Sequence, residues 1–161
     1  MDQNTKYFLF ITGVFGISSI ILQSLLVPLI EITVWRPDLV LVIVLLSGKR
    51  FGSAGGSTAG FVLGVVQDSL SGMPVGITAM PKAMAGYFSG KTRGSGQSGT
   101  AHYVLFIILI LMHELITYAF FQYKTDLSYL YLLYSRIFPN SAYTMIMLFI
   151  VNVFFNKYFT E

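Results

Sequence analysis

The sequence has no cysteine and few charged residues. Of its 161 residues, 11% are charged and 55% are hydrophobic, whereas a soluble domain has about 25% charged residues. The lack of cysteine excludes disulfide bonds, thiolate catalysis and cysteine-ligated metals. The scarcity of charge, with several apolar runs near the length of about 20 residues that a membrane helix needs, predicts a polytopic membrane protein of the all-α class. We expect a single integral membrane domain over residues 1–161.

Six apolar runs of unequal length predict a bundle of six transmembrane helices. They comprise residues 7–30, 39–48, 51–67, 75–90, 103–121 and 137–155. The second run crosses only about half of the hydrocarbon core, so its ends must lie deep or be sheltered by protein. Pro81 predicts a kink in the fourth run. Segment 91–100 is typical of a flexible loop, and the tyrosine-rich segment 122–136 of an amphipathic interfacial stretch.

The basic residues between the runs predict the orientation of the chain. One set of alternate connections carries Lys6, Lys49, Arg50, Lys91, Arg93 and Lys157, and the other carries Arg36, Lys124 and Arg136. Cytoplasmic connections are enriched in lysine and arginine, so six against three favours both termini in the cytoplasm. The net charge of +3 is scattered rather than gathered on one face, which argues against a nucleic-acid partner.

Glycines recur at a spacing that predicts close helix packing. The third run contains four glycines spaced by four residues, and the fourth run adds two more: Gly52, Gly56, Gly60, Gly64, Gly86 and Gly90. A spacing of four keeps residues along one face of a helix. In lipid, small residues on such a face let two backbones approach closely. No phosphate-binding glycine motif is present.

Three ionisable residues lie inside apolar runs, where a polar site is expected. They are Lys82, His113 and Glu114. Counted at the helical rise from the ends of their runs, Lys82 lies about 9 Å and Glu114 about 10 to 11 Å from the same surface. We therefore predict a buried pair of Lys82 with Glu114. In the structural reading, the pair only fixes the helix register, or Lys82 reaches outward to the interface on its own. In the functional reading, the pair lines a polar pocket for a partner side chain or ligand.

No catalytic motif is complete. His113-Glu114 begins like the zinc-protease motif HExxH, but Thr117 stands where the second histidine is required. A GxSxG nucleophile elbow is also absent. We therefore expect no enzyme activity, no catalytic residues, no metal and no cofactor; a lipid-modifying enzyme would need a catalytic set that this sequence does not offer.

The order of several motifs resembles that of the MreD family of rod shape-determining membrane proteins. The resemblance covers roughly residues 36–93. It comprises Arg36-Pro37-Asp38-Leu39, a short apolar run ending in Lys49-Arg50, Gly60-Phe-Val-Leu-Gly64-Val-Val-Gln-Asp68-Ser-Leu-Ser-Gly72-Met-Pro74-Val-Gly76, and Gly86-Tyr87-Phe88-Ser89-Gly90. Its most specific parts are Pro-Asp-Leu and Asp-x-x-Ser-Gly-x-Pro-x-Gly, because glycines alone are common in membrane helices.

The resemblance implies a fold, a location and partners. The fold would be a six-helix bundle similar to the substrate-binding S component of energy-coupling-factor transporters. The protein would be a non-catalytic scaffold in the bacterial cytoplasmic membrane, acting in the complex that elongates the cell wall. It would bind MreC and work with MreB, RodA and a class B penicillin-binding protein. Candidate periplasmic turns or partner contacts are then Pro37, Asp38, Asp68, Ser71, Gly72, Pro74 and Gly76.

The alternative hypothesis is the substrate-binding membrane component of a vitamin transporter. Such a component would hold a small molecule in its outer pocket and would dock a transport partner through small residues of its first helix. The first run contains Gly13, Gly16, Ser18 and Ser19, but no Ala-x-x-x-Ala pair. The weakness of that feature, beside the motif from Asp68 to Gly76, favours the scaffold.

Overall fold

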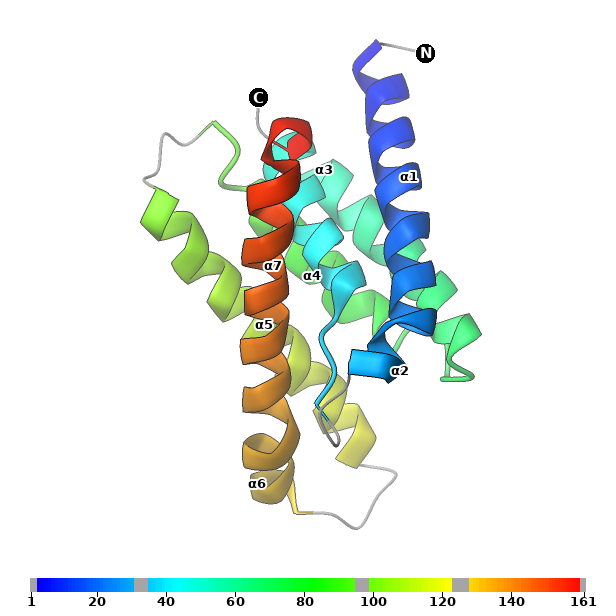
Figure 1. The fold of residues 1–161 in the computed structure, drawn as a ribbon, viewed down its shortest axis with the longest axis vertical. Helices are drawn as coiled ribbons and strands as arrows, with labels where there is room; N and C mark the ends of the chain where they lie inside the picture. Colours follow the sequence, from blue (N-terminus) through cyan, green and yellow to red (C-terminus); the bar gives the residue numbers. More distant parts are fainter. Residues whose placement is uncertain (1–2, 31–34, 95–98, 123–127, 160–161) are drawn as a thin grey trace.

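The computed structural model describes residues 3–30, 35–94, 99–122 and 128–159. Within these ranges the regular elements are all helices. They are α1 (Gln3–Leu25), α2 (Val27–Ile30), α3 (Leu39–Leu70), α4 (Ala79–Gly90), α5 (Gly99–Gln122), α6 (Tyr129–Leu132), the π-helix η1 (Leu133–Ile137) and α7 (Phe138–Phe159). Figure 1 shows that they form one bundle, in which α1 begins and α7 ends at the same end.

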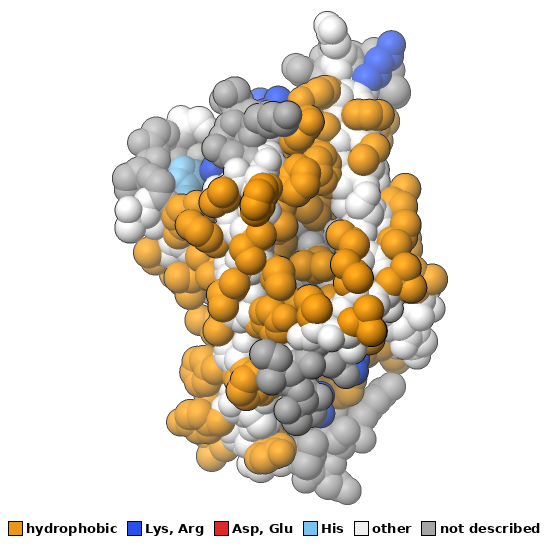
Figure 2. All heavy atoms as spheres, viewed as in Figure 1, with side chains coloured by type: hydrophobic (Ala, Val, Ile, Leu, Met, Phe, Trp, Pro, Cys, Tyr) orange, Lys and Arg blue, Asp and Glu red, His pale blue; other side chains and the backbone are white. Residues whose placement is uncertain are grey.

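Four helical segments of the described chain are long and apolar enough to cross a membrane. They are Thr5–Leu25, Leu39–Leu70, Thr100–Gln122 and Tyr129–Phe155. Figure 2 shows that apolar side chains cover most of this face of the bundle and that basic side chains are few, as expected of a surface in contact with hydrocarbon. The predicted all-α class and membrane character are confirmed. The six predicted runs give four such segments, because the second and third runs share α3 and the fourth forms a helix of only 12 residues.

Helix α3 reverses direction at Gly52. This residue has a φ of 82° and a ψ of −178°, a conformation that glycine adopts readily and other residues avoid. A Cβ atom added to Gly56 would lie 2.6 Å from Gly48 Cα, although residues eight apart in a straight helix are separated by about 12 Å. The two halves of α3 therefore fold back on one another, as Figure 1 shows. Gly52 was predicted to belong to the helix-packing row; it also forms the bend, and its backbone lies against Gly90 of α4.

The other glycines of the row bring α3 against α4. A Cβ atom added to Gly56 would lie 2.2 Å from Gly86 O. One added to Gly60 would lie 2.4 Å from Lys82 O, and one added to Gly64 would lie 2.4 Å from Ala79 Cα. On α4, a Cβ atom added to Gly86 would lie 2.1 Å from the backbone of α3, and one added to Gly90 would lie 2.2 Å from it. At these five glycines there is thus no space for a side chain. The backbones of α3 and α4 pack directly on each other, which small residues make possible.

The first half of α3 is the centre of the core. Every residue from Val40 to Gly48 is buried, which explains how so short an apolar run is accommodated: the remaining helices surround it. A helix that is surrounded by other helices does not face lipid, so it does not have to match the thickness of the hydrocarbon core. Around it pack apolar side chains from the first and the last two long helices, including Ile11, Phe106, Ile110 and Leu148.

The fourth predicted run begins later than expected and is not kinked. Helix α4 starts at Ala79, so Pro81 lies in its first turn. The N–H groups of the first turn have no partner within a helix, and a proline there removes no hydrogen bond. The predicted kink at Pro81 is therefore wrong. Of the predicted loop 91–100, residues 91–94 form a turn and residues 95–98 lie outside the described residues; of segment 122–136, residues 123–127 also lie outside.

Candidate functional site

The segment before α3 is extended, and α1 supplies partners for its backbone. The side-chain amide of Gln23 donates to Pro37 O at 2.9 Å, and its carbonyl oxygen accepts from Leu39 N at 2.8 Å. A single glutamine thus pairs with one acceptor and one donor of an extended chain. In an apolar interior such backbone groups must find a partner within the protein.

Helix α7 and the π-helix η1 that precedes it supply further partners of this segment. Asn140 Oδ1 accepts from Arg36 N at 2.9 Å, and Thr144 Oγ1 accepts from Asp38 N at 3.0 Å. The indole of Trp35 donates to Ser135 O at 2.9 Å. That carbonyl lies four residues before Pro139, which has no N–H to donate to it. The indole therefore supplies the donor that the proline lacks.

Asp38 joins this segment to α4. Its Oδ1 accepts from Leu41 N at 2.8 Å and caps the start of α3, while its Oδ2 accepts from Lys82 Nζ at 2.6 Å. The Lys82 side chain is fully buried. The contact is therefore an ion pair inside the bundle.

His113 and Glu114 extend the pair to α5. His113 Nε2 lies 3.3 Å from Lys82 Nζ and 4.0 Å from Asp38 Oδ2. Because an ammonium group only donates, this contact makes Nε2 the acceptor and leaves the ring hydrogen on Nδ1. Nδ1 lies 3.6 Å from Glu114 Oε1. We call Asp38, Lys82, His113 and Glu114 the buried polar cluster; all four are at most 8% exposed.

The structure brings the three predicted polar residues together but changes the partner of Lys82. Its carboxylate partner is Asp38 and not the predicted Glu114, which lies on the far side of His113. The helical rise estimates the depth of a residue in the membrane, whereas the direction of its side chain around the helix depends on how the helices pack. Depth alone therefore placed Lys82, His113 and Glu114 near one another but assigned the wrong carboxylate as the partner of Lys82.

The cluster is suited to holding helices together. It links the start of α3, α4 and α5 through one ammonium group, one imidazole and two carboxylates. Among the described residues, no group of three or more histidine, cysteine, aspartate or glutamate side chains could hold a metal ion. The acidic oxygens of Asp38 are already used by a helix cap and by Lys82. This arrangement connects three helices through contacts between their own side chains.

Asp68 has a separate role at the other turn of α3. Its buried carboxylate accepts from the backbone N–H groups of Gly76, Thr78 and Ala79, at 2.8 to 3.3 Å, and from the Thr78 hydroxyl. It therefore caps the positive end of α4. Gly72 and Gly76 have φ values of 66° and 108°, so both positions favour glycine.

Burial divides the predicted partner-contact residues into two groups. Pro37, Asp38 and Asp68 are buried, and their contacts lie within the bundle. Ser71, Gly72 and Pro74 are exposed, together with the apolar side chains of Leu70 and Val75, and Gly76 is half-buried between the two groups. Of these predicted contact residues, the ones at the tip of the turn are thus accessible to a partner.

Three side chains that hold the site were not predicted. Gln23, Asn140 and Thr144 pair with the extended segment. The available signal was the presence of uncharged polar residues inside apolar runs, since such groups at membrane depth pair with one another or with backbone. The prediction considered only ionisable residues at this depth.

Comparison with known proteins gives one family. The family model described as rod shape-determining protein MreD matches residues 3–160. No curated protein and no solved structure matches the chain. The family match takes in almost the whole chain and extends the resemblance of residues 36–93 to the first and last helices.

Proposed function

Because this chain belongs to the MreD family, we propose that it is a non-catalytic scaffold of the bacterial cell-wall elongation complex. It resides in the cytoplasmic membrane as a single domain and binds MreC. MreB, RodA and a class B penicillin-binding protein are further partners. The family match over residues 3–160 is the observation that supports this proposal, and it gives no support to a vitamin transporter.

The buried polar cluster supports a binding role rather than catalysis. Lys82 is fully buried and engaged with Asp38 and His113. Catalysis on a lipid or wall precursor requires polar groups within hydrogen-bond reach of the reacting atoms. The charges of this cluster instead face one another across three helices. A rigid bundle of this kind presents a fixed surface to its partners.

We further propose that the bundle crosses the membrane six times, with both termini in the cytoplasm. The two halves of α3 count as separate crossings on either side of Gly52, and α4 is a short one beside them. The excess of lysine and arginine at the end of the bundle where α1 begins supports this orientation.

Cysteine labelling tests this topology, because the chain has no cysteine of its own. In intact cells, a maleimide that does not cross the membrane is expected to label Ser71→Cys but not Lys91→Cys. Both positions are exposed and lie in turns at opposite ends of the bundle. Labelling of Lys91→Cys from outside, with Ser71→Cys protected, would reverse the orientation.

The accessible tip of the turn between α3 and α4 is the proposed contact with MreC. Leu70 and Val75 are 65% and 62% exposed there, and apolar side chains at a membrane surface suit a protein partner. Affinity purification from native membranes should recover MreC with the unaltered chain and much less with Val75→Asp. Leu29→Asp is the control, because Leu29 is 78% exposed at the same end but on α2.

Two outcomes would contradict the proposal. Recovery of a transporter ATPase without any wall-synthesis protein would overturn the scaffold. Undiminished recovery of MreC with Val75→Asp would move the contact away from the turn but leave the scaffold in place.

A further inference from the structure

A groove lies between α4 and the second half of α3, on the side of α4 that the bundle leaves uncovered. It has a volume of about 360 Å³. The side chains that line it include Ser57 and Phe61 of α3 and Met80, Ala83, Tyr87 and Phe88 of α4. The α4 residues recur mostly three or four positions apart, so they lie along one face of the helix. From Met80 to Phe88 the groove is about 12 Å long at the helical rise.

The wall of the groove is almost entirely apolar. Phe61 and Met80 are 56% and 60% exposed, whereas Ser57 and Ala83 are half-buried and too small to fill the space between the larger side chains. In lipid there is no hydrophobic force that drives apolar groups together, so a ligand is held by how well it packs. The groove is therefore suited to an apolar chain that matches its shape.

The size of the groove favours a lipid chain over a protein helix. Two turns of a helix that is 10 Å wide with its side chains occupy about 850 Å³. This is more than twice the volume of the groove. A helix of a partner could only lie across the rim, whereas an extended acyl chain is thin enough to lie inside.

A lysine lies at one end of the groove. Lys91 Nζ is 5.1 Å from the centre of the Tyr87 ring and 5.5 Å from that of Phe88, and both rings line the groove. Cation–π contact holds the ammonium group at these rings, while the residue stays exposed. Among the described residues, the carboxylates are those of Asp38, Asp68 and Glu114. All three are buried, and none of them lines the groove.

We propose that this groove binds one acyl chain of an anionic phospholipid, whose head group pairs with Lys91. Because the groove and the ammonium group share two aromatic rings, a chain that lies against Tyr87 and Phe88 brings its head group to Lys91. A lysine at a membrane surface attracts anionic lipids. The proposal rests on the crossing of α4 proposed above, which cysteine labelling tests separately, and not on any protein partner.

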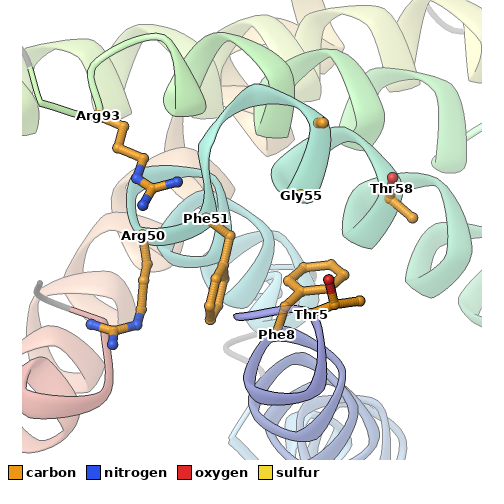
Figure 3. Close-up of a pocket in the computed structure, with 8 residues that line it drawn as sticks. Thr5, Phe8, Arg50, Phe51, Gly55, Thr58 and Arg93 are labelled. Carbon is orange, nitrogen blue, oxygen red and sulfur yellow. The ribbon is translucent and has the colours of Figure 1, made fainter. Parts of the chain in front are cut away.

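Arg93 offers a matched control for Lys91. The two residues belong to the same turn after α4, and both are exposed cations. Arg93 does not line the groove; it lines a cavity on the other side of the bend of α3, with Thr5 and Phe8 of α1. Figure 3 shows its side chain reaching toward that bend. General attraction of anions to this end should therefore fall equally without either cation, whereas a head-group contact at the groove should be lost only without Lys91.

Lipid titration of the purified full chain in a zwitterionic detergent, followed by native mass spectrometry, tests the head-group contact. It compares phosphatidylglycerol with phosphatidylcholine of the same acyl chains. Phosphatidylglycerol is expected to bind the unaltered chain about fivefold more tightly. Lys91→Gln should abolish this preference without weakening phosphatidylcholine, and Arg93→Gln should keep it.

The same titration tests the acyl-chain site with a variant that fills the groove. Ala83→Phe places a ring in the space between α3 and α4 and should weaken the binding of both lipids several-fold. Val14→Phe is its control, because Val14 is exposed on α1 and does not line the groove. This control should leave the affinity for both lipids unchanged.

Each remaining outcome would overturn the proposal. Equal affinity of the unaltered chain for the two lipids, or the same loss with Arg93→Gln as with Lys91→Gln, would leave only non-specific attraction. Unchanged binding of both lipids to Ala83→Phe, with reduced recovery of wall-synthesis proteins from native membranes, would assign the groove to a helix of a partner. Competition by glycerol phosphate at the concentration of the lipid would assign Lys91 to a soluble phosphate. If Ala83→Phe does not fold, Lys91→Gln alone decides, because Lys91 is exposed.

Discussion

The α3–α4 pair and the α5–α7 pair are both packed inside the same bundle, but by different contacts. Between α3 and α4, glycine backbones touch, and no Cβ atom fits at Gly60 or Gly86. Between α5 and α7 the contacts are made by long side chains, such as Asn152 with the Tyr103 hydroxyl at 2.9 Å. In the most apolar stretch of α3, 56% of the residues are buried, against 33% in α5 and 28% in the α6–α7 segment.

This difference predicts where the molecule tolerates change. A contact between backbones leaves no rotamer that could adjust to an added atom. Long side chains at a lipid-facing pair can adopt other rotamers, and lipid can fill the space that they leave. Substitutions should therefore be costly in α3 and α4 and mild in α5 and α7. The four predictions below follow this order, from the largest expected effect to the smallest.

The largest effect is expected at the buried polar cluster. Lys82→Met leaves the Asp38 carboxylate buried without its ammonium partner, which should lower the free energy of unfolding by about 3–5 kcal/mol. Adding Asp38→Asn removes the unpaired charge and should restore part of the loss. Reversible unfolding in mixed detergent micelles measures both. If Glu114→Gln costs as much as Lys82→Met, the cluster is not centred on the Lys82–Asp38 pair.

The glycine contact should come second. Gly60→Ala places a methyl group 2.4 Å from Lys82 O, so the helices must separate, at a cost of about 1–3 kcal/mol. Gly13→Ala is the matched control, because a Cβ atom there has nothing within 4 Å. This control should be neutral or slightly stabilising. The same unfolding measurement compares the two, and equal effects would contradict backbone packing between α3 and α4.

The cap at Asp68 should have a smaller effect. Asp68→Ala leaves the first N–H groups of α4 without their acceptor, and we expect a loss of about 0.5–2 kcal/mol. Asp68→Asn keeps an oxygen acceptor and should lose less. Thermal unfolding followed by helical circular dichroism would show the order of the two variants. A larger loss for the asparagine variant would mean that Asp68 does not act as a cap.

The smallest effect is expected on the lipid-facing surface of α7. Phe149 is 56% exposed, and Phe149→Leu replaces one apolar side chain by another. The change in unfolding free energy should stay within about 0.5 kcal/mol. A loss as large as that of Gly60→Ala would show that α5 and α7 are no more tolerant than α3 and α4.

Composition and the length of the apolar runs predicted much of this fold, because helices that face the hydrocarbon of a membrane must be long and apolar. The all-α class and the membrane character follow from apolar runs alone. The bend at Gly52 could not be separated from the packing glycines around it, since its spacing from Gly56 is the same as that of Gly60. Its positive φ depends on the reversal of the chain and not on its neighbours in sequence.

The site was predicted in part for a similar reason. Lys82, His113 and Glu114 were identified because charge is rare in apolar runs. Asp38 was named only as a candidate turn or partner contact, which the resemblance implied. Only the packing of α4 against both halves of α3 shows that this cap residue also meets Lys82. The polar partners Gln23, Asn140 and Thr144 depend in the same way on which helices become neighbours.

The pairing of the segment before α3 has a consequence for the order of assembly. Arg36 and Asp38 use acceptors on α7, which the ribosome produces more than 100 residues later. Until that helix arrives, two amide groups and an indole in the segment before α3 have no lasting partner. The native arrangement of the early helices is therefore completed only after α7 has been made. A chain interrupted before α7 would keep these groups unpaired, a mark by which membrane quality control could recognise an unfinished product.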